Sequence, residues 1–158
     1  KRNQLFHNIS SLIYTSAEQA NRFFEMLLNG GEYNGTQIMS PQTVFRATLP
    51  TSATSIDRTL LAPMRYALGP MLGNNPVGIF GPHTGQAFGH LGFSNILCWA
   101  DPERDISVSI LNTGKSVVGT HLKSLANVLL QISTQCPKIP KAQRRSLFST
   151  DRTTMDLV

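Results

Sequence analysis

The chain has 158 residues, 41% of them hydrophobic and 15% charged, which is typical of one folded globular domain and excludes a largely disordered protein. Its net charge is +5, but the basic residues are scattered and lack the clustering and interleaved aromatic residues of a nucleic-acid-binding face, so we expect no nucleic acid partner. No apolar run approaches the roughly 18 residues of a membrane span, so we expect no membrane-spanning segment in this sequence.

The first predicted helix begins in residues 15–20 and ends at Gly30 and Gly31. A capping box, formed by Ser16 with Gln19 or by Thr15 with Glu18, opens it. Apolar side chains recur along it at helical spacing, and we expect them to belong to the core. The two glycines that follow can end the helix, because glycine adopts the left-handed backbone conformation at little cost in free energy.

The next segments are shorter. Ser40 and Pro41 supply an N-cap and a first-turn proline, which predicts a short helix near residues 42–48. Residues 49–63 are rich in Ser, Thr and Pro and are interpreted as a loop. Its length would suit a flexible edge of a functional site.

Three short strands are predicted between residues 88 and 112. The first carries His90 between Gly89 and Gly92, and we expect these glycines to leave the backbone open to close approach by a ligand or another segment. The other two strands form a hairpin closed by residues 101–105, where Pro102 suits the second position of a turn.

The hairpin strands carry two burial patterns. In residues 106–110 apolar side chains alternate with serines, which predicts a strand that is buried on one face only. In the preceding strand Cys98 is expected to be a small buried hydrophobic residue and Trp99 a core residue. Cys98 and Cys136 form neither a disulfide framework nor a metal-ligand spacing. We therefore predict no metal ion and no cofactor, and the cellular compartment stays open.

The last predicted helix has about four turns, and Pro137 and Pro140 stop it. Its apolar stripe consists of Val118, Leu122, Leu125, Val128, Leu129 and Ile132. Residues 137–158 are expected to be a basic, disordered tail, solvated rather than bound to an anionic partner. The chain thus divides into residues 1–136 and residues 137–158.

The three strands resemble the C-terminal part of the serine β-lactamase/penicillin-binding-protein superfamily, in particular its class C-like and esterase branch. That branch has a third active-site motif, Lys-Thr-Gly or His-x-Gly, on an inner strand, and His90-Leu91-Gly92 matches the second form. The resemblance covers about residues 10–135. It implies an α/β (α+β) fold with a β-lactamase-like antiparallel sheet flanked by helices, of which residues 1–136 are the C-terminal half.

The resemblance also implies site residues. In this family a serine, activated by the Lys of a Ser-x-x-Lys motif, attacks an acyl carbon, and a Tyr-x-Asn tyrosine assists proton transfer. His90 would add positive character opposite the serine, and the backbone N–H of Phe93 would be an oxyanion-hole donor. Leu91, Gly92 and Ser94 would line the substrate-binding wall.

Two departures from the family pattern bear on activity. Neither Ser-x-x-Lys nor Tyr-x-Asn occurs in the sequence, and the family places both N-terminal to the segments found here. Leu91 lacks the hydroxyl that Lys-Thr-Gly offers to a substrate carboxylate, and His90 is neutral for much of the time near pH 7. We therefore expect an uncharged ester or amide as substrate, a chain that is inactive alone, and a missing N-terminal half or self-association as its partner.

A non-catalytic alternative stays open. Half of a sheet exposes strand edges and an apolar face, which would suit a binding or self-assembling module derived from the same fold. His90 would then be a structural residue. His83 lies close to it in sequence and is a weaker candidate for the rim of a pocket.

Overall fold

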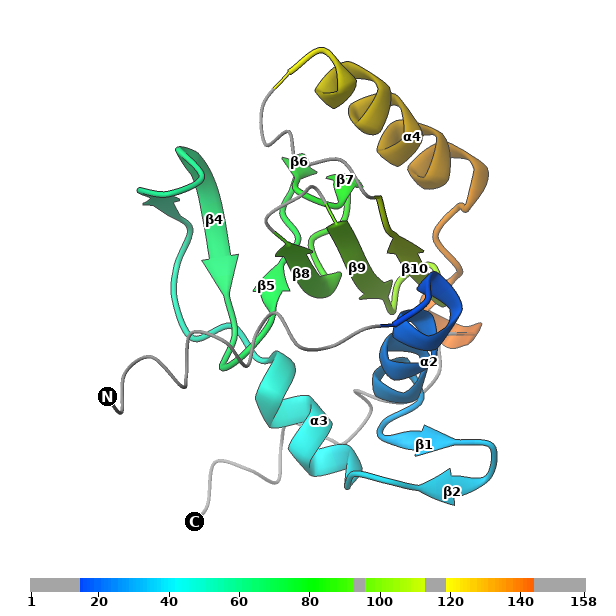
Figure 1. Ribbon diagram of the computed structural model, residues 1–158. Helices are drawn as coiled ribbons and strands as arrows, with labels where there is room; N and C mark the ends of the chain where they lie inside the picture. Colours follow the sequence, from blue (N-terminus) through cyan, green and yellow to red (C-terminus); the bar gives the residue numbers. More distant parts are fainter. Residues whose placement is uncertain (1–14, 93–95, 113–118, 144–158) are drawn as a thin grey trace, which may run out of the picture.

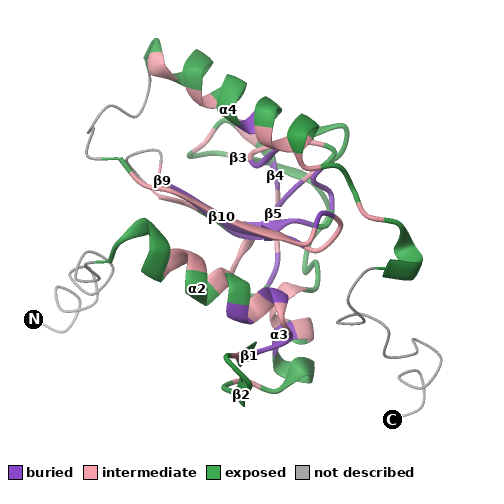
Figure 2. Ribbon diagram, turned by 90° about the vertical axis from the view of Figure 1, so that its right-hand side faces the viewer, coloured by how far each residue is buried: buried purple, intermediate pink, exposed green. Residues whose placement is uncertain are grey.

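The computed structural model describes residues 15–92, 96–112 and 119–143, and in them one antiparallel sheet lies between two helices (Figures 1 and 2). Its six strands follow the order β10-β9-β8-β5-β4-β3. Their bounds are β3 Ser55–Asp57, β4 Ala62–Tyr66, β5 Met71–Leu72, β8 Phe88–Gly92, β9 Ile96–Asp101 and β10 Ile106–Ile110. This mixture of helices and antiparallel strands confirms the predicted fold class.

Helix α2 (Ala17–Leu28) covers one face of the sheet and helix α4 (His121–Gln135) covers the other (Figure 2). The remaining elements are α3 Pro41–Thr48, the β-ribbons β1 Glu32–Tyr33 with β2 Thr36–Gln37 and β6 Val77–Gly78 with β7 Gly81–Pro82, and the 3-10 helix η1 Lys141–Gln143. In the part of the chain that the structure describes, no helix combines the length and the apolar character that crossing a membrane requires.

Both predicted helix starts are confirmed by their caps. At α2 the Gln19 N–H donates to Ser16 Oγ at 3.2 Å, and the Ser16 N–H donates to Gln19 Oε1 at 3.1 Å, so the capping box uses this pair. At α3 the Thr43 N–H donates to Ser40 Oγ at 3.1 Å, and Pro41 occupies the first turn. These contacts, which join only neighbours in the chain, fix where α2 and α3 begin.

Two hydrophobic clusters hold the layers together. On the α2 side, Phe24, Leu27 and Leu28 pack with Ala67, Leu72, Phe88 and Ala100. On the α4 side, Leu129 packs with Phe80, Ala87, Leu97 and Trp99. Trp99 is 1% exposed and stacks on Phe80 with ring centroids 5.5 Å apart, which confirms its predicted place in the core.

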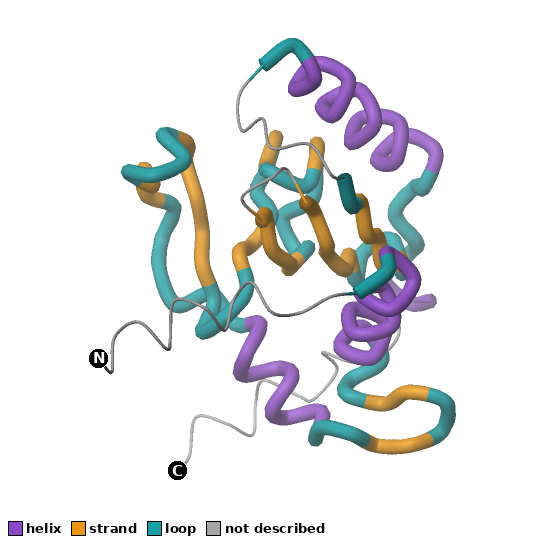
Figure 3. Tube along the Cα trace, viewed as in Figure 1, coloured by secondary structure: helices purple, strands orange, loops and turns teal. Residues whose placement is uncertain are grey.

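The prediction of a loop over residues 49–63 is wrong in its second half. Strand β3 and the start of β4 lie there and pair with each other (Figure 3). The turn between them is held by Asp57, whose Oδ1 accepts the N–H groups of Thr59 and Leu60, each at 2.8 Å. Strand pairing here overrides a composition that is poor in strand-forming residues.

The burial predicted for β10 is also wrong, because both of its faces are covered. Val108 and Ile110 pack against the α4-side cluster, as expected. The serine face, predicted to meet solvent, instead lies under α2, where Ser109 Oγ is 3.5 Å from Asn21 Oδ1. Small polar side chains suit this place because they allow a helix to approach the sheet closely.

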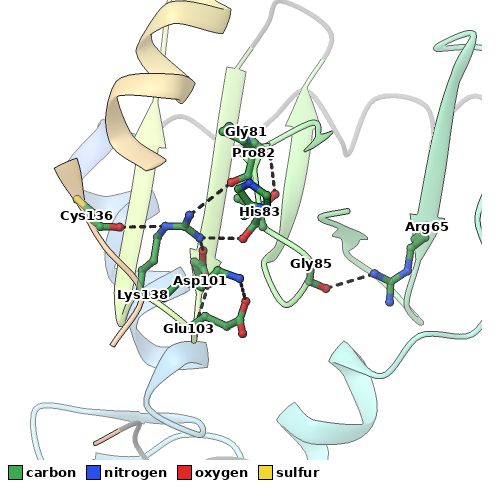
Figure 4. A network of polar contacts seen from close by, with 11 residues as sticks. Arg65, Gly81, Pro82, His83, Gly85, Asp101, Glu103, Cys136 and Lys138 are labelled. Carbon is green, nitrogen blue, oxygen red and sulfur yellow. Dashed lines mark hydrogen bonds and ion pairs between the residues drawn. The ribbon is translucent and has the colours of Figure 1, made fainter. Parts of the chain in front are cut away.

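The tip of the β9–β10 hairpin carries a buried ion pair. Arg104 Nη1 lies 2.7 Å from Asp101 Oδ2, and the two side chains are 5% and 1% exposed. The same guanidinium donates to the carbonyls of Cys136 and His83, each at 3.0 Å, and of Pro82 at 3.4 Å (Figure 4). We call these five residues the hairpin-tip cluster. It joins the end of α4 to the loop that leads into β8.

The first part of the predicted tail is tied to the same hairpin. The Ile139 N–H donates to the Glu103 carbonyl at 2.9 Å, and Lys138 forms an ion pair with the Glu103 carboxylate. Residues 137–143 therefore differ from the disordered tail that we expected from residue 137 onwards. The rest of that segment lies outside the described residues, as does Val118 of the predicted helical stripe.

Candidate functional site

Strand β8, which carries the His-x-Gly motif, is paired along its whole length on one side only. On this side it pairs with β9 over all five of its residues, from Phe88 opposite Ala100 to Gly92 opposite Ile96. On the other side β5 pairs with Phe88 and Gly89 and then ends. Within the described ranges, no strand therefore pairs with the β5-side edge of β8 at residues 90–92, and we call this stretch the open edge.

The backbone of Leu91 faces the open edge. Its N–H points to Met71 Sδ, 3.5 Å away on β5. Because the N–H and C=O of one strand residue point the same way and alternate along the strand, the Leu91 carbonyl faces the open edge too, whereas the polar groups of His90 and Gly92 face β9. At the open edge the backbone groups of Leu91 thus lie beside the motif, and their partners are the side chains of Met71 and His90 and not a strand.

The His90 side chain is exposed and lies on the α2 side of the sheet, the side of its alternate neighbour Phe88. Cys98 stands directly opposite on β9, followed by Ser109 on β10. Helix α2 packs over β9 and β10, and His90 stays accessible beside it. The imidazole is therefore not enclosed in a hydrophobic interior, where it could not contact a substrate.

One hydrogen bond orients the His90 ring. Its Nδ1 lies 2.9 Å from the carbonyl oxygen of Leu91. Because a carbonyl oxygen only accepts, Nδ1 must carry the hydrogen in this arrangement. In the neutral ring the other nitrogen, Nε2, then has a lone pair and accepts.

The other predicted site residues are placed unequally. The Leu91 side chain packs against the α4-side cluster, so that its backbone, and not its side chain, faces the open edge. Gly92 is half-buried at the end of β8. Phe93 and Ser94 lie outside the described residues, and their roles stay predictions.

The two glycines around His90 have different reasons to be glycine. A Cβ on Gly89 would lie 2.2 Å from the Cys98 carbonyl oxygen and 2.4 Å from Trp99 Cβ. Of the two expected reasons for a bare backbone at Gly89, a ligand or another segment, the second therefore applies, because strand β9 occupies that space. A Cβ on Gly92 would approach Ile96 Cβ to 3.3 Å, which is tight but no backbone collision.

The loop before β8 holds the weaker candidate. His83 is exposed and has a positive φ of 55°, and its carbonyl accepts from Arg104. Its role at a pocket rim stays a prediction. The hairpin-tip cluster that fixes this loop was missed in the sequence, where its only sign is an Asp-x-x-Arg pattern inside a predicted turn.

A tyrosine–carboxylate pair was also missed. The Tyr66 hydroxyl donates to Asp57 Oδ2 at 2.6 Å, and this bond raises the pKa of Tyr66 to about 12 and lowers the pKa of Asp57. A phenol that holds its proton so strongly is a poor general base near pH 7. Tyr66 therefore does not replace the absent tyrosine motif.

Comparison with known proteins finds similarity both in sequence and in structure. Over 91 residues the chain is 30% identical to the esterase/β-lactamase LipL of Mycobacterium tuberculosis, covering 58% of this chain and 20% of LipL. A penicillin-binding-protein homologue from Caulobacter crescentus has a similar structure, with a TM-score of 0.56, 28% identity and coverage of 65% of this chain and 28% of that chain. No family model matches the sequence.

A family VIII carboxylesterase supports the fold alone. Its TM-score is 0.58 at 22% identity, and the match covers 75% of this chain and 31% of that chain. The chain thus spans about a fifth of LipL and less than a third of either solved structure.

Proposed function

Because this chain belongs to the β-lactamase/penicillin-binding-protein-like superfamily, we propose that it supplies one wall of a serine hydrolase that cleaves esters or amides through an acyl-enzyme. The observation that carries the proposal is the exposed His90 beside the open edge of β8. A motif strand with a structural role only would have no need of an accessible imidazole beside an edge that, among the described residues, no strand covers.

In this proposal the substrate lies along the open edge. The backbone N–H of Phe93, which lies outside the described residues, is the predicted donor that would stabilise the negative charge that develops on the attacked carbonyl oxygen. The attacking serine would belong to a Ser-x-x-Lys motif of a segment that this sequence does not contain. The proposed catalytic residue of this chain is His90, which would face the reacting group.

An uncharged acyl substrate suits the wall best. Leu91 has no hydroxyl, and its side chain packs on the α4 side, away from His90. A neutral imidazole attracts a carboxylate far less than the lysine of a Lys-Thr-Gly motif does. We therefore propose short esters or amides without a carboxylate as substrates, and not β-lactam antibiotics.

The partner that we propose pairs with β10. This strand ends the six-stranded order, and among the described residues no strand lies on its outer side. Both of its faces are nevertheless covered, by α2 and by the α4-side cluster, as in an interior strand. A strand from the missing N-terminal half would complete the sheet there.

The second candidate is a self-assembling or binding module. Ile56 and Leu61, on the hairpin of β3 and β4, are 66% and 81% exposed, which favours contact with another protein surface. In this case the outer edge of β10, at the opposite end of the sheet, would be a second contact and would pair with another copy of the chain.

Reconstitution with the proposed N-terminal segment decides between the two candidate functions. The 158-residue chain would be tested alone, and together with the polypeptide encoded directly upstream of Lys1, for labelling by a fluorophosphonate and hydrolysis of a short-chain nitrophenyl ester. We expect activity only in the combined protein, and a loss of at least tenfold in kcat on His90→Ala but not on His83→Ala. Labelling of the chain alone, or a combined protein that is indifferent to His90→Ala, would overturn the proposal. A stable oligomer that no probe labels would support the module.

A further inference from the structure

We propose that the Leu91 carbonyl holds His90 in its Nδ1–H form, so that Nε2 meets the substrate as a hydrogen-bond acceptor and selects a substrate that carries a hydroxyl or amide N–H donor. This proposal rests on the proposed function for its substrate, but the state of the ring can be tested without it.

The arrangement starts from the backbone. The carbonyl of Leu91 faces the open edge, where β5 has ended, so that among the described residues it lacks the strand partner that a backbone carbonyl normally has. The His90 ring supplies the missing donor at 2.9 Å. The ending of one strand thus decides how the neighbouring side chain is oriented.

The chemistry of imidazole turns this orientation into a choice of form. A neutral ring has one N–H and one bare nitrogen. With the hydrogen on Nε2, the lone pair of Nδ1 would face the carbonyl oxygen of Leu91, and two acceptors would repel each other. The Nδ1–H form removes the repulsion and gains a hydrogen bond, and it points the lone pair of Nε2 away from the strand.

The polarity of the wall follows from this form. A lysine at the same place would only donate, and it would attract a substrate carboxylate. The Nε2 lone pair does the reverse, since it repels a carboxylate and binds a donor. A substrate without the donor would leave this nitrogen unpaired once water is excluded, which is how polar sites discriminate between analogues.

The first experiment determines, in the 158-residue chain, which ring nitrogen of His90 carries the hydrogen. Two-bond ¹H–¹⁵N correlation spectra at about pH 8.5, where an ordinary imidazole is neutral, distinguish N–H from bare nitrogens. We expect His90, assigned through a His90→Gln variant, to show Nδ1 as the N–H nitrogen. Exposed His83 serves as the internal reference. A His90 with its hydrogen mainly on Nε2, or one that averages both forms equally, would overturn the proposal.

The second experiment tests selection in the reconstituted enzyme. In nitrophenyl esters of a 2-hydroxy acid and of its 2-methoxy analogue, a methyl group replaces the hydrogen of the donor. We expect the wild-type protein to prefer the hydroxy ester about 10-fold in kcat/KM and His90→Lys to lose this preference. Active protein without a preference would overturn this inference and leave the proposed function standing. Inactive protein would count against the proposed function, while the spectra still decide the form of the ring.

Discussion

Single residues already show where a glycine is needed for packing. Gly89 has the Cys98 carbonyl and Trp99 where its side chain would be, so Gly89→Ala must push β8 away from β9. We expect a loss of at least about 2 kcal/mol in the free energy of unfolding, measured with urea. Gly69→Ala is the matched control, because a Cβ there meets nothing within 4 Å. Equal stability of the two variants would contradict this packing role.

Tyr66 gives a prediction about pH. Its bond to Asp57 raises its pKa from 10.0 to about 12, so the folded state favours the protonated phenol. The resulting stability is fully present below pH 10.0 and is lost as the pH rises through about 12. Ultraviolet titration of phenolate should show a late component that is absent from Tyr66→Phe and shifted to lower pH in Asp57→Asn. A wild-type chain without this late component would refute the assignment.

The sequence revealed residues whose role is local and hid those whose role depends on distant partners. His90-Leu91-Gly92 could be recognised because the motif is continuous, and the Ser16–Gln19 box because a cap needs only neighbours in the chain. For Arg104 the only local sign was its spacing from Asp101. Its acceptors on Pro82 and Cys136 are 22 and 32 residues away, and only the folded chain brings them together.

Between elements, Arg104 should be the strongest polar connection. Replacement by Met keeps much of the apolar stem but leaves Asp101 charged and buried without its partner. We expect thermal unfolding to show a loss of about 3–5 kcal/mol. Exposed Arg46→Met is the control and should change stability by less than about 0.5 kcal/mol.

A second substitution separates charge from packing in this connection. Asp101→Asn combined with Arg104→Met removes the isolated charge and should recover part of the loss. If the double variant is as unstable as the sum of the single ones, Asp101 and Arg104 are not energetically coupled, and the account of the hairpin-tip cluster is wrong.

Residues 137–143 should stabilise the hairpin to which they are bound. A chain ending at residue 136 loses the Ile139–Glu103 hydrogen bond and the Lys138–Glu103 ion pair, whereas one ending at residue 143 keeps both. We expect the shorter chain to be less stable by about 1–2 kcal/mol, mostly from the backbone bond, because the Lys138 side chain is partly exposed. Unfolding by urea measures the difference. Identical midpoints would show that this segment only rests on the surface.

Elements with strong periodic patterns were predicted well and those defined by pairing were not. Helix α2 and the β9–β10 hairpin have clear caps, turns and apolar spacing in the sequence. Strand β3 has three residues, one of them Asp57, and exists because β4 lies beside it. The same dependence on neighbours hid the true surroundings of β10, since an alternating pattern shows which face is apolar but not what covers the other face.

At the scale of the whole molecule, two observations about β10 point in opposite directions. Among the described residues it is the last strand in the order and has an unpaired outer edge, yet helix α2 and the α4-side cluster pack on its two faces. Unpaired edges of this kind favour pairing with a further strand. The proposed completion of the sheet and the alternative of self-association both use this edge, so a single substitution can test whether the edge is used at all.

Proline at Ser107 is that substitution. The alternation that turns the Leu91 N–H toward β5 turns the Ser107 N–H, two strands away, toward the outer edge and that of Val108 toward β9. Ser107→Pro should therefore keep the β9–β10 ladder and remove one donor from the edge, whereas Val108→Pro should disrupt the ladder itself.

We expect Ser107→Pro to weaken association at least tenfold, whether with the missing segment or with another copy of the chain, at little cost to the unfolding midpoint. Light scattering and titration with the upstream polypeptide measure the affinity. Ser107→Thr, which keeps the N–H and favours a strand, should bind like the wild-type chain. A proline variant that associates as tightly as the threonine variant would mean that β10 is a true edge of this protein and that its partner, if it has one, binds elsewhere.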